Sequence, residues 1–363
     1  MQPSRWLPFL AWWPTLDRHT WRADALAALS GAIVVLPQAV AFATIAGLPP
    51  QYGFYAAMLP AIVAGLWGSS RHMVSGPTTA ISVLVFATLS PLAGPGSPQY
   101  VSMAITLAFL AGAMQLAMGL LRLGALVNFI SHTVIVGFTA GAAVLIMISQ
   151  LRNFVGLGFP HGTPLSAMLQ AAATQCGMGN VLAGLVGAAT LASGLLARRI
   201  WPKVPYMIVA MVVGGLLAAL LKHTMPEAAA AIRTVGALPQ VIPQLSMPDL
   251  SPASLRALLF PAAVVAVIGL TEAVAIARAV ATRSGQRLDA DQEFIGQGLS
   301  NLIGGLTSAY PSSGSFNRSG INHEAGARTA MAAVLSAPVL LLIALVAAPL
   351  AAFPAGFEAF LAF

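Results

Sequence analysis

Two Ser-Gly steps lie in matching parts of this chain, and each leads into a short run that can form a helix. The first is Ser75–Thr79, which reads SGPTT, and the second is Ser313–Arg318, which reads SGSFNR. A helix that begins within a membrane directs unpaired N–H groups and its positive dipole end at whatever lies before it. Two such ends in corresponding halves indicate the binding site of a transporter. Because both helix ends are positive, the ligand they favour is an anion.

Arg318 and Glu272 are the two ionisable residues that the hydropathy pattern places at membrane depth, where such residues mark functional sites. A guanidinium is permanently charged and binds oxyanions as a fork, so Arg318 is a candidate anion ligand. The alternative, an arginine paired with a carboxylate or with carbonyls, is compatible with that role. Glu272 is a candidate site for a coupling ion. Its alternative is an ion pair that locks two helices together.

The charge of Glu272 decides what the site can bind. Each helix end supplies about +0.5 and Arg318 supplies +1, so a protonated Glu272 leaves about +2 in total, which suits a divalent anion. An ionised Glu272 lowers the sum to about +1. A proton and a dianion are therefore expected to reinforce each other's binding, as reciprocal linkage requires.

Composition places these residues in a helical membrane protein. Hydrophobic residues make up 58% of the 363 positions and charged residues 7%, against roughly a quarter in soluble domains. The apolar runs have the length of membrane helices and do not alternate as barrel strands do. The expected spans are 25–46, 52–66, 78–92, 101–121, 129–150, 181–196, 206–221, 258–281, 294–306, a short piece at 316–322, 330–350 and a run from 353.

The net charge of +7 is explained by a membrane orientation better than by nucleic acid. With the amino terminus inside, eleven basic residues fall on cytoplasmic ends and four fall outside, at Arg152, Lys222, Arg233 and Arg256. A bacterial inner membrane protein is expected. Cys176 is alone, and the sequence shows no metal cluster, cofactor loop or nucleophile arrangement, which argues against an enzyme.

The remaining polar residues receive structural interpretations. Asp24 is expected at the start of a span. Asp289, Asp291 and Glu293 are expected in an inner linker and helix start, where acidic residues are favourable. His72 and His132 have no partner pattern for a metal and are expected at the membrane interface.

Two halves follow a tryptophan-rich segment, 1–24, that suits either the headgroup region or an ordinary packed amino-terminal helix. The first half is 25–221, a proline-rich extracytoplasmic linker is 222–256, and the second half is 257–363. Gln38 precedes Gly76 by 38 positions, and Glu272 precedes Gly314 by 42. The halves are therefore expected to be repeats, inverted because an odd number of spans separates them.

Several motifs resemble those of one transporter family. The stretch Pro49–Pro60 (PPQYGFYAAMLP), followed by Gly68–Pro77 (GSSRHMVSGP), resembles the signature of the sulfate permease family, which includes animal solute-carrier anion exchangers. The second half agrees with the same family in order. Its motifs are Thr271–Ala279 (TEAVAIARA), Asp291–Asn301 (DQEFIGQGLSN), Gly314–Ser319 (GSFNRS), Asn322 and Gly326–Thr329 (GART).

The resemblance implies an all-α polytopic fold of fourteen segments in two inverted sevens, with two half helices that meet in mid-membrane. Family members usually also carry a cytoplasmic STAS domain and are commonly dimeric. In this sequence the second repeat is expected to be incomplete from its twelfth segment, without a STAS domain, and a homodimer is expected for the full-length protein.

The resemblance also implies the site. Its expected anion-binding residues are Gln38, Phe42, Thr78, Thr79, Ser315, Phe316, Asn317 and Arg318. In sodium-coupled members a hydroxyl follows the carboxylate by one turn, whereas here Ile276 follows Glu272. Because sodium needs several oxygen ligands, a proton is the expected coupling ion.

The expected function is proton-coupled secondary transport of an inorganic anion, sulfate above all, by alternating access of a core made of spans one to four and eight to eleven. Bicarbonate or dicarboxylate transport and an uncoupled anion channel are the alternatives. A nucleobase transporter would have carboxylates at both core positions, which Asn317 and Arg318 disfavour. A membrane protein without transport would leave Arg318 without a function.

Overall fold

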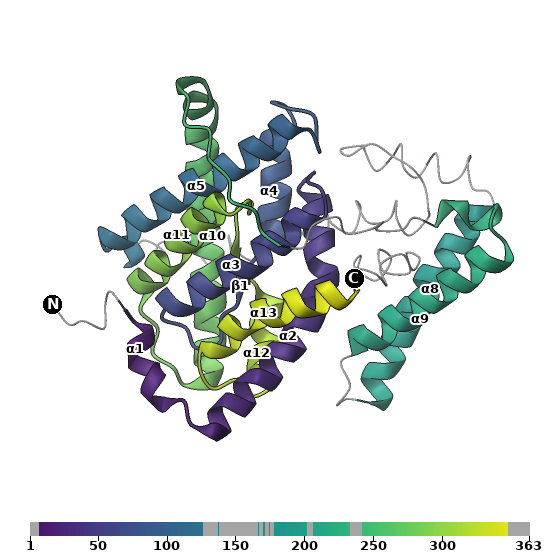
Figure 1. Cartoon of the computed structure of the whole chain (residues 1–363), viewed down its shortest axis with the longest axis horizontal. Coiled ribbons are helices and arrows are strands. Elements are labelled where there is room, and N and C mark those ends of the chain that lie inside the picture. Colours follow the sequence, from purple (N-terminus) through teal and green to yellow (C-terminus); the bar gives the residue numbers. More distant parts are fainter. Residues whose placement is uncertain are drawn as a thin grey trace. The chain divides into compact units, whose positions relative to one another are not determined.

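The computed structural model describes residues 7–125, 178–201, 206–232 and 242–347, with four single residues in the first gap. The expected spans at 129–150 and from 353 lie outside the described residues. Contacts divide the chain into two compact units, 1–137 with 239–345 and 138–238 with 346–363, and each is described by itself. The division differs from the two sequence halves, since the first unit draws elements from both (Figure 1).

The first unit contains most of the described elements. They are α1 (Phe9–Trp12), η2 (Trp13–Thr15), α2 (Arg18–Ile45), α3 (Gln51–Trp67), β1 (Ser75–Gly76), α4 (Thr79–Leu89), α5 (Pro98–Leu120), α10 (Pro252–Ser284), α11 (Ala290–Leu306), β2 (Ser313–Gly314), α12 (Phe316–Glu324) and α13 (Met331–Ala347). The second unit contains α8 (Met178–Ile200), α9 (Tyr206–Thr224) and η4 (Ala228–Ala231), which pack around an apolar cluster that includes Leu182, Val186 and Ile232.

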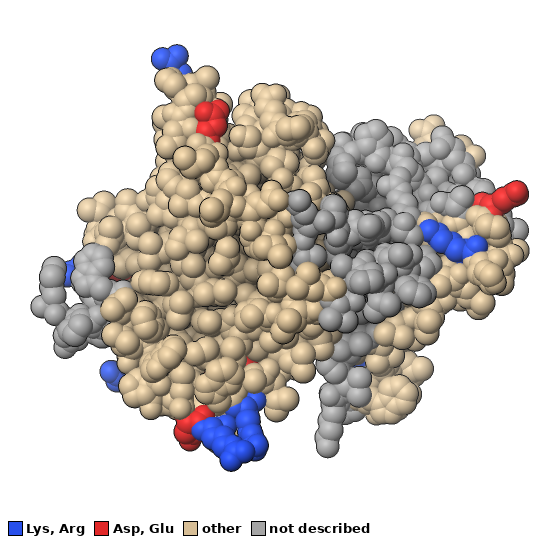
Figure 2. Space-filling model, in the orientation of Figure 1, with Lys and Arg blue, Asp and Glu red and all other residues tan. Residues whose placement is uncertain are grey.

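Three described helices are long and apolar enough to cross a membrane, namely α5, α10 and Val181–Ile200 of α8. A fourth candidate is α2, which bends by 42° between Leu36 and Gln38. The sequence has a proline at this bend, and an interior proline removes a hydrogen bond of the helix ladder. Figure 2 shows that charged side chains gather in small groups and leave wide uncharged areas on the visible face, as a lipid-facing surface requires.

Side-chain caps set where the long helices begin. The Asp17 Oδ1 accepts a hydrogen bond from the Thr20 backbone N at 2.6 Å, so α2 begins at Arg18, seven residues before the expected start of the span at 25. Residues 18–24 are therefore helical, and Asp24 lies inside the helix and is fully buried. Ser97 and Ser251 cap α5 and α10 in the same way, each followed by a proline at the first helical position.

Glycines let α5 and α11 approach closely. A Cβ on Gly112 would lie 2.4 Å from the Leu302 backbone N, and one on Gly298 would lie 2.3 Å from the Leu116 backbone N. Small residues at such contacts are typical of packed membrane helices. The close approach holds α11 in place, and α11 in turn holds the loop before β2 through Asn301, which donates to the Ser312 carbonyl at 2.9 Å.

Candidate functional site

The two Ser-Gly steps pair directly with each other. β1 and β2 form an antiparallel pair in which Ser75 faces Gly314 and Gly76 faces Ser313. The Ser315 backbone N extends the contact by donating to the Val74 carbonyl at 3.0 Å. This pair, called here the crossing, brings the N-terminal tips of α4 and α12 together, as sequence reasoning expected for two half helices.

Each half helix begins with a hydroxyl cap. Thr78 is the N-cap of α4, and its Oγ1 accepts from the Ile81 backbone N at 3.3 Å. Ser315 is the N-cap of α12, and its Oγ accepts from the Arg318 backbone N at 3.5 Å. Thr79 and Phe316 are therefore the first helical residues, and free N–H groups of both tips point toward the crossing.

Arg318 lies across the crossing and is only 1% exposed. Its Nη2 donates to the Pro77 carbonyl at 2.9 Å, and its Nη1 donates to the Ser75 carbonyl at 3.4 Å. These partners are neutral carbonyls, so they orient the guanidinium without cancelling its charge. The carbonyl-paired arginine considered from the sequence is thus the geometry observed.

Gly76 makes room for this guanidinium. Its φ is +152°, and a Cβ there would lie 2.5 Å from Arg318 Nη1 and 2.8 Å from Nη2. A larger residue at this position would have to displace the arginine, because real Cβ atoms do not approach other atoms so closely. The glycine of the first tip is therefore matched to the arginine of the second.

Glu272 contacts the first tip from α10. Its side chain is half-buried, and its Oε2 accepts from the Thr78 Oγ1 at 3.1 Å. Thr78 thus caps α4 and bonds to the carboxyl group with one hydroxyl. One turn after Glu272, the buried Ile276 packs in an apolar cluster with Met73 and Ala277, so that position offers no side-chain oxygen.

Gln38 and Phe42 lie on the part of α2 that follows the bend, and both are half-buried. The Gln38 Oε1 is buried and has no hydrogen-bond partner among the described residues. Helix α2 packs against both α4 and α12. An amide with spare hydrogen-bonding capacity at this place could bind a polar ligand.

The other expected residues are less enclosed. Thr79 is half-buried, Asn317 is exposed, and Phe316 is 61% exposed. The structure therefore brings Thr78, Glu272 and Arg318 around the crossing. It gives no hydrogen-bond contact of Asn317 among the described residues.

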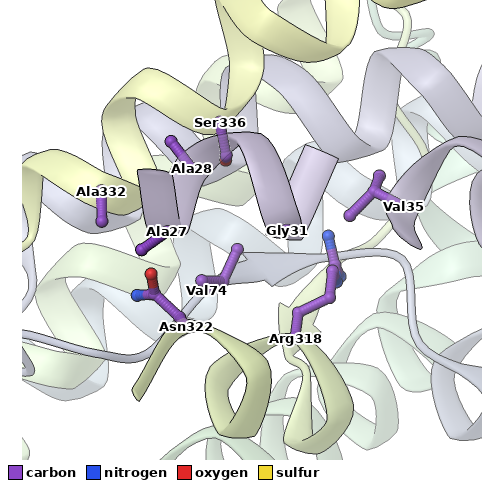
Figure 3. Close-up of a pocket in the computed structure, with 9 residues that line it drawn as sticks. All are labelled: Ala27, Ala28, Gly31, Val35, Val74, Arg318, Asn322, Ala332 and Ser336. Atoms are coloured by element: carbon purple, nitrogen blue, oxygen red, sulfur yellow. The ribbon is translucent and has the colours of Figure 1, made fainter. Parts of the chain in front are cut away.

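A small cavity lies on the side of Arg318 that faces α2 and α13. Figure 3 shows Arg318 and Asn322 of α12 directed toward α2, with Ser336 of α13 above them. Its volume is about 10 Å³, room for one water molecule at most, so a polyatomic anion does not fit there. The Arg318 Nε is buried without a partner among the described residues.

Sequence reasoning missed the residues of α11 that hold the crossing. Gln297 Nε2 donates to the Ser75 Oγ at 2.5 Å, and Asn301 Oδ1 accepts from the Ser312 backbone N at 2.7 Å. The sequence does contain a signal for this role, because Gln297 and Asn301 lie one turn apart in a largely uncharged helix. Buried amides need hydrogen-bond partners, so this spacing indicates contacts with another segment.

Two further residues have contacts that the sequence did not indicate. Glu293 lies in the first turn of α11, as expected, behind the cap Asp289, and its carboxyl group is buried against Ser69 and Ser70. His72 is buried with its ring 4.9 Å from that of His323, and its place at the membrane interface stays a prediction. His132 lies outside the described residues. Among the residues that the structure describes, no group of three or more His, Cys, Asp or Glu side chains could hold a metal ion.

Comparison with known proteins shows which family has this sequence and this architecture. The family model described as the sulfate permease family matches residues 21–354. The chain is 31% identical over 338 residues to "Sulfate transporter 4.1, chloroplastic" of Arabidopsis thaliana, covering 93% of this chain and 48% of that protein. It is 33% identical over 352 residues to a "Probable sulfate transporter" of Mycobacterium tuberculosis, covering 97% of this chain and 62% of that protein.

Among solved structures, the transmembrane domain of a cyanobacterial bicarbonate transporter, BicA, matches with a TM-score of 0.84 at 27% identity. The match covers 96% of this chain and 88% of that domain. The chain thus spans about half to three fifths of the length of the two curated relatives, and most of the length of a transmembrane domain.

These likenesses confirm the expected fold class. The chain is an integral membrane protein with the all-α, seven-plus-seven inverted-repeat transporter fold, in which α4 and α12 are the half helices. The family match covers most of its length. The chain belongs to the sulfate permease family.

Proposed function

We propose that this chain forms the membrane domain of a secondary active transporter that carries a small inorganic anion, with sulfate as the first candidate. The observation that supports this proposal is the crossing, where two helix tips and the buried Arg318 lie together. The names of the curated relatives point to sulfate.

The charges around the crossing favour a negative solute. Each tip contributes about +0.5, and the guanidinium adds a full positive charge that its carbonyl partners leave uncancelled. An oxyanion could use the unpaired N–H groups of Thr79 and Phe316, as anions do at helix N-termini. Gln38, Phe42, Ser315 and Asn317 complete the proposed anion-binding set with Thr78 and Arg318.

Glu272 is the proposed proton carrier. Its hydrogen bond with Thr78 links the carboxyl group to the cap of the first tip, so its protonation state acts where the anion binds. The absence of an oxygen ligand at Ile276 supports a proton over sodium. Coupling then follows from charge, since the proton raises the positive charge that a dianion meets.

The proposed transport cycle is alternating access. The first compact unit contains α2 to α5 and α10 to α13, which are the described elements of the proposed core. Inverted repeats at 25–221 and 257–363, an extracytoplasmic linker at 222–256 and an interfacial segment at 1–24 remain part of the proposal. So do a cytoplasmic amino terminus, a bacterial inner membrane and a homodimer of the full-length protein.

Bicarbonate is the second candidate substrate, because the matched transmembrane domain belongs to a bicarbonate transporter. Bicarbonate is a monovalent oxyanion, so an ionised Glu272 would leave a site charge of about +1 that suits it. The two candidates therefore differ in the protonation state of one residue.

The test is uptake of labelled sulfate, bicarbonate and fumarate into proteoliposomes that contain the full-length protein, with and without a pH gradient. We expect sulfate uptake that an inward proton gradient accelerates. Bicarbonate uptake without such acceleration would overturn the sulfate assignment. Steady anion current at every voltage, independent of any gradient, would overturn transport in favour of a channel.

Glu272→Gln separates binding from coupling. The amide cannot ionise, so we expect the variant to retain sulfate uptake and lose its dependence on pH. Glu324→Gln, an exposed carboxylate at the end of α12, is the matched control and should behave as the wild type. Wild-type pH dependence in Glu272→Gln would exclude the coupling role.

A further inference from the structure

A buried carboxyl group outside the proposed anion site, that of Glu293 of α11, holds the loop between α3 and β1. It is 0% exposed. Its Oε1 accepts from the Ser69 backbone N at 2.7 Å, from the Ser69 Oγ at 3.0 Å and from the Ser70 backbone N. Its Oε2 is buried and has no partner among the described residues. Oε1 therefore accepts three hydrogen bonds, whereas Oε2 accepts none from the described residues.

Gln297 lies four residues later on the same helix, and one of its side-chain atoms also lacks a hydrogen-bond partner among the described residues. Its Nε2 donates to the Ser75 Oγ, while its Oε1 is buried without a partner in the described part of the chain. Residues four apart on a helix lie on one face and can pair. A buried acceptor without a donor is costly, and two acceptors can pair with each other only if one of them carries a hydrogen.

The helices around Glu293 provide no cation. α11 packs against α3 and α5, and neither of these contains an Asp, Glu, Lys, Arg or His residue. α10 also contacts α11, but its basic residues Arg256, Arg278 and Arg283 are all exposed. An ionised Glu293 would therefore be a buried charge without a counter-ion, which proteins avoid.

The other titratable groups of this junction are occupied or exposed. Asp289 caps α11, and Asp291 accepts from the Gly124 backbone N at 2.8 Å. On the loop, Arg71 is exposed and His72 lies against His323. The acidic Glu272 on α10 is bonded to Thr78. None of these contacts supplies the hydrogen that Oε2 lacks.

We propose that Glu293 binds a proton in this conformation and donates it from Oε2 to the Oε1 of Gln297. One hydrogen then satisfies both unpartnered oxygens. It completes a chain of hydrogen bonds from Ser69 and Ser70 through Glu293 and Gln297 to Ser75 in the crossing. This proton site is separate from Glu272 and does not depend on which anion the protein carries.

Asp24 is a buried carboxyl group in the same molecule whose hydrogen-bond partners differ from those of Glu293. It is also 0% exposed, but both of its oxygens have donors. Oδ1 accepts from the Arg328 backbone N at 2.7 Å and the Thr329 backbone N at 3.2 Å, and Oδ2 accepts from the Thr329 hydroxyl. Asp24 is therefore the matched control for Glu293.

Infrared spectroscopy of the purified full-length protein at neutral pH tests the proposal. The wild type should show the carbonyl stretch of a protonated carboxylic acid, shifted by exchange into D₂O. The band assigned to this site should disappear in Glu293→Gln and persist in Glu272→Gln and Asp24→Asn. A wild type without such a band, or a band unchanged in Glu293→Gln, would overturn the proposal.

Thermal unfolding and a second variant keep the test decisive. Glu293→Gln keeps an acceptor for the loop and gains an N–H for Gln297, so the unfolding temperature of this variant should fall less than that of Asp24→Asn. An equal or larger fall contradicts the proposal. If Glu293→Gln does not fold, Gln297→Leu should move the acid band to the frequency of a carboxyl group without an acceptor, and an unmoved band would be contrary evidence.

Discussion

The tips of α4 and α12 have the same backbone plan but different chemistry. Each has a Ser-Gly strand, then an N-cap hydroxyl, then a short helix. α4 has the sequence TAISVLVFATL, without a charged residue, whereas α12 has the sequence FNRSGINHE and supplies Arg318. The first tip in turn supplies the two carbonyls that orient the arginine and the hydroxyl that meets Glu272.

This difference shows how a repeated backbone can form an asymmetric site. The pairing of β1 with β2 needs only backbone groups, so both halves can keep it. The positive charge comes from one tip and is oriented by the other, and neither half has a complete site. Substitutions on the two sides should therefore have different consequences even where the local geometry is alike.

The largest expected effect is at the glycine of the first tip. Gly76→Ala combines a strained φ with a collision against the Arg318 guanidinium, and we expect it to lower stability by about 3 kcal/mol and to abolish uptake. In Gly314→Ala the added Cβ would lie 2.9 Å from the Met73 Sδ and 3.0 Å from the Ala273 Cα, but the φ of Gly314 is not strained, so we expect a smaller loss of about 1–2 kcal/mol.

Thermal unfolding and sulfate uptake measure both effects. Gly320→Ala is the control, because a Cβ there meets nothing within 4 Å and alanine favours a helix. Equal losses for Gly76→Ala and Gly314→Ala would show that the arginine does not depend on the first tip.

The next effect concerns the guanidinium itself. Arg318→Lys keeps the charge and loses the fork that reaches the Pro77 and Ser75 carbonyls, so we expect apparent sulfate affinity to fall by about 30-fold, or about 2 kcal/mol. Arg318→Gln also loses the charge and should reduce affinity further. Concentration dependence of uptake measures this, with the exposed Arg278→Lys as control. Wild-type affinity in Arg318→Lys would show that charge alone is enough.

Much of the fold could be predicted because its determinants are local. Hydropathy and proline or glycine positions located α3 within one residue at each end, predicted as 52–66 and observed as Gln51–Trp67. The second half helix, predicted as 316–322, is Phe316–Glu324. The start of α2 was seven residues late because the apolar run begins at 25, whereas the helix begins at the cap Asp17.

The contacts of the site could not be predicted in the same way, because they join residues far apart in the chain. Arg318 bonds to Pro77 and Ser75 across 241 and 243 positions of the chain, and Glu293 bonds to Ser69 across 224. Residue type suggested that Arg318 and Glu272 are functional, but not which atoms they bind. The position of Glu293 at the start of α11 was predicted, but not the burial of its carboxyl group against Ser69 and Ser70.

The smallest expected effect is a difference between Thr78 and Ser315, the two N-cap residues, in the pH dependence of uptake. Thr78→Ala and Ser315→Ala each remove one N-cap, and we expect each to cost about 1 kcal/mol or less in stability. Only Thr78 also donates to Glu272, so only Thr78→Ala should alter the pH dependence of sulfate uptake, while Thr78→Ser should restore it. Since the Ser315 hydroxyl bonds to its own helix, a change in pH dependence in Ser315→Ala equal to that in Thr78→Ala would mean that protonation acts through both tips, and the asymmetry would be limited to Arg318.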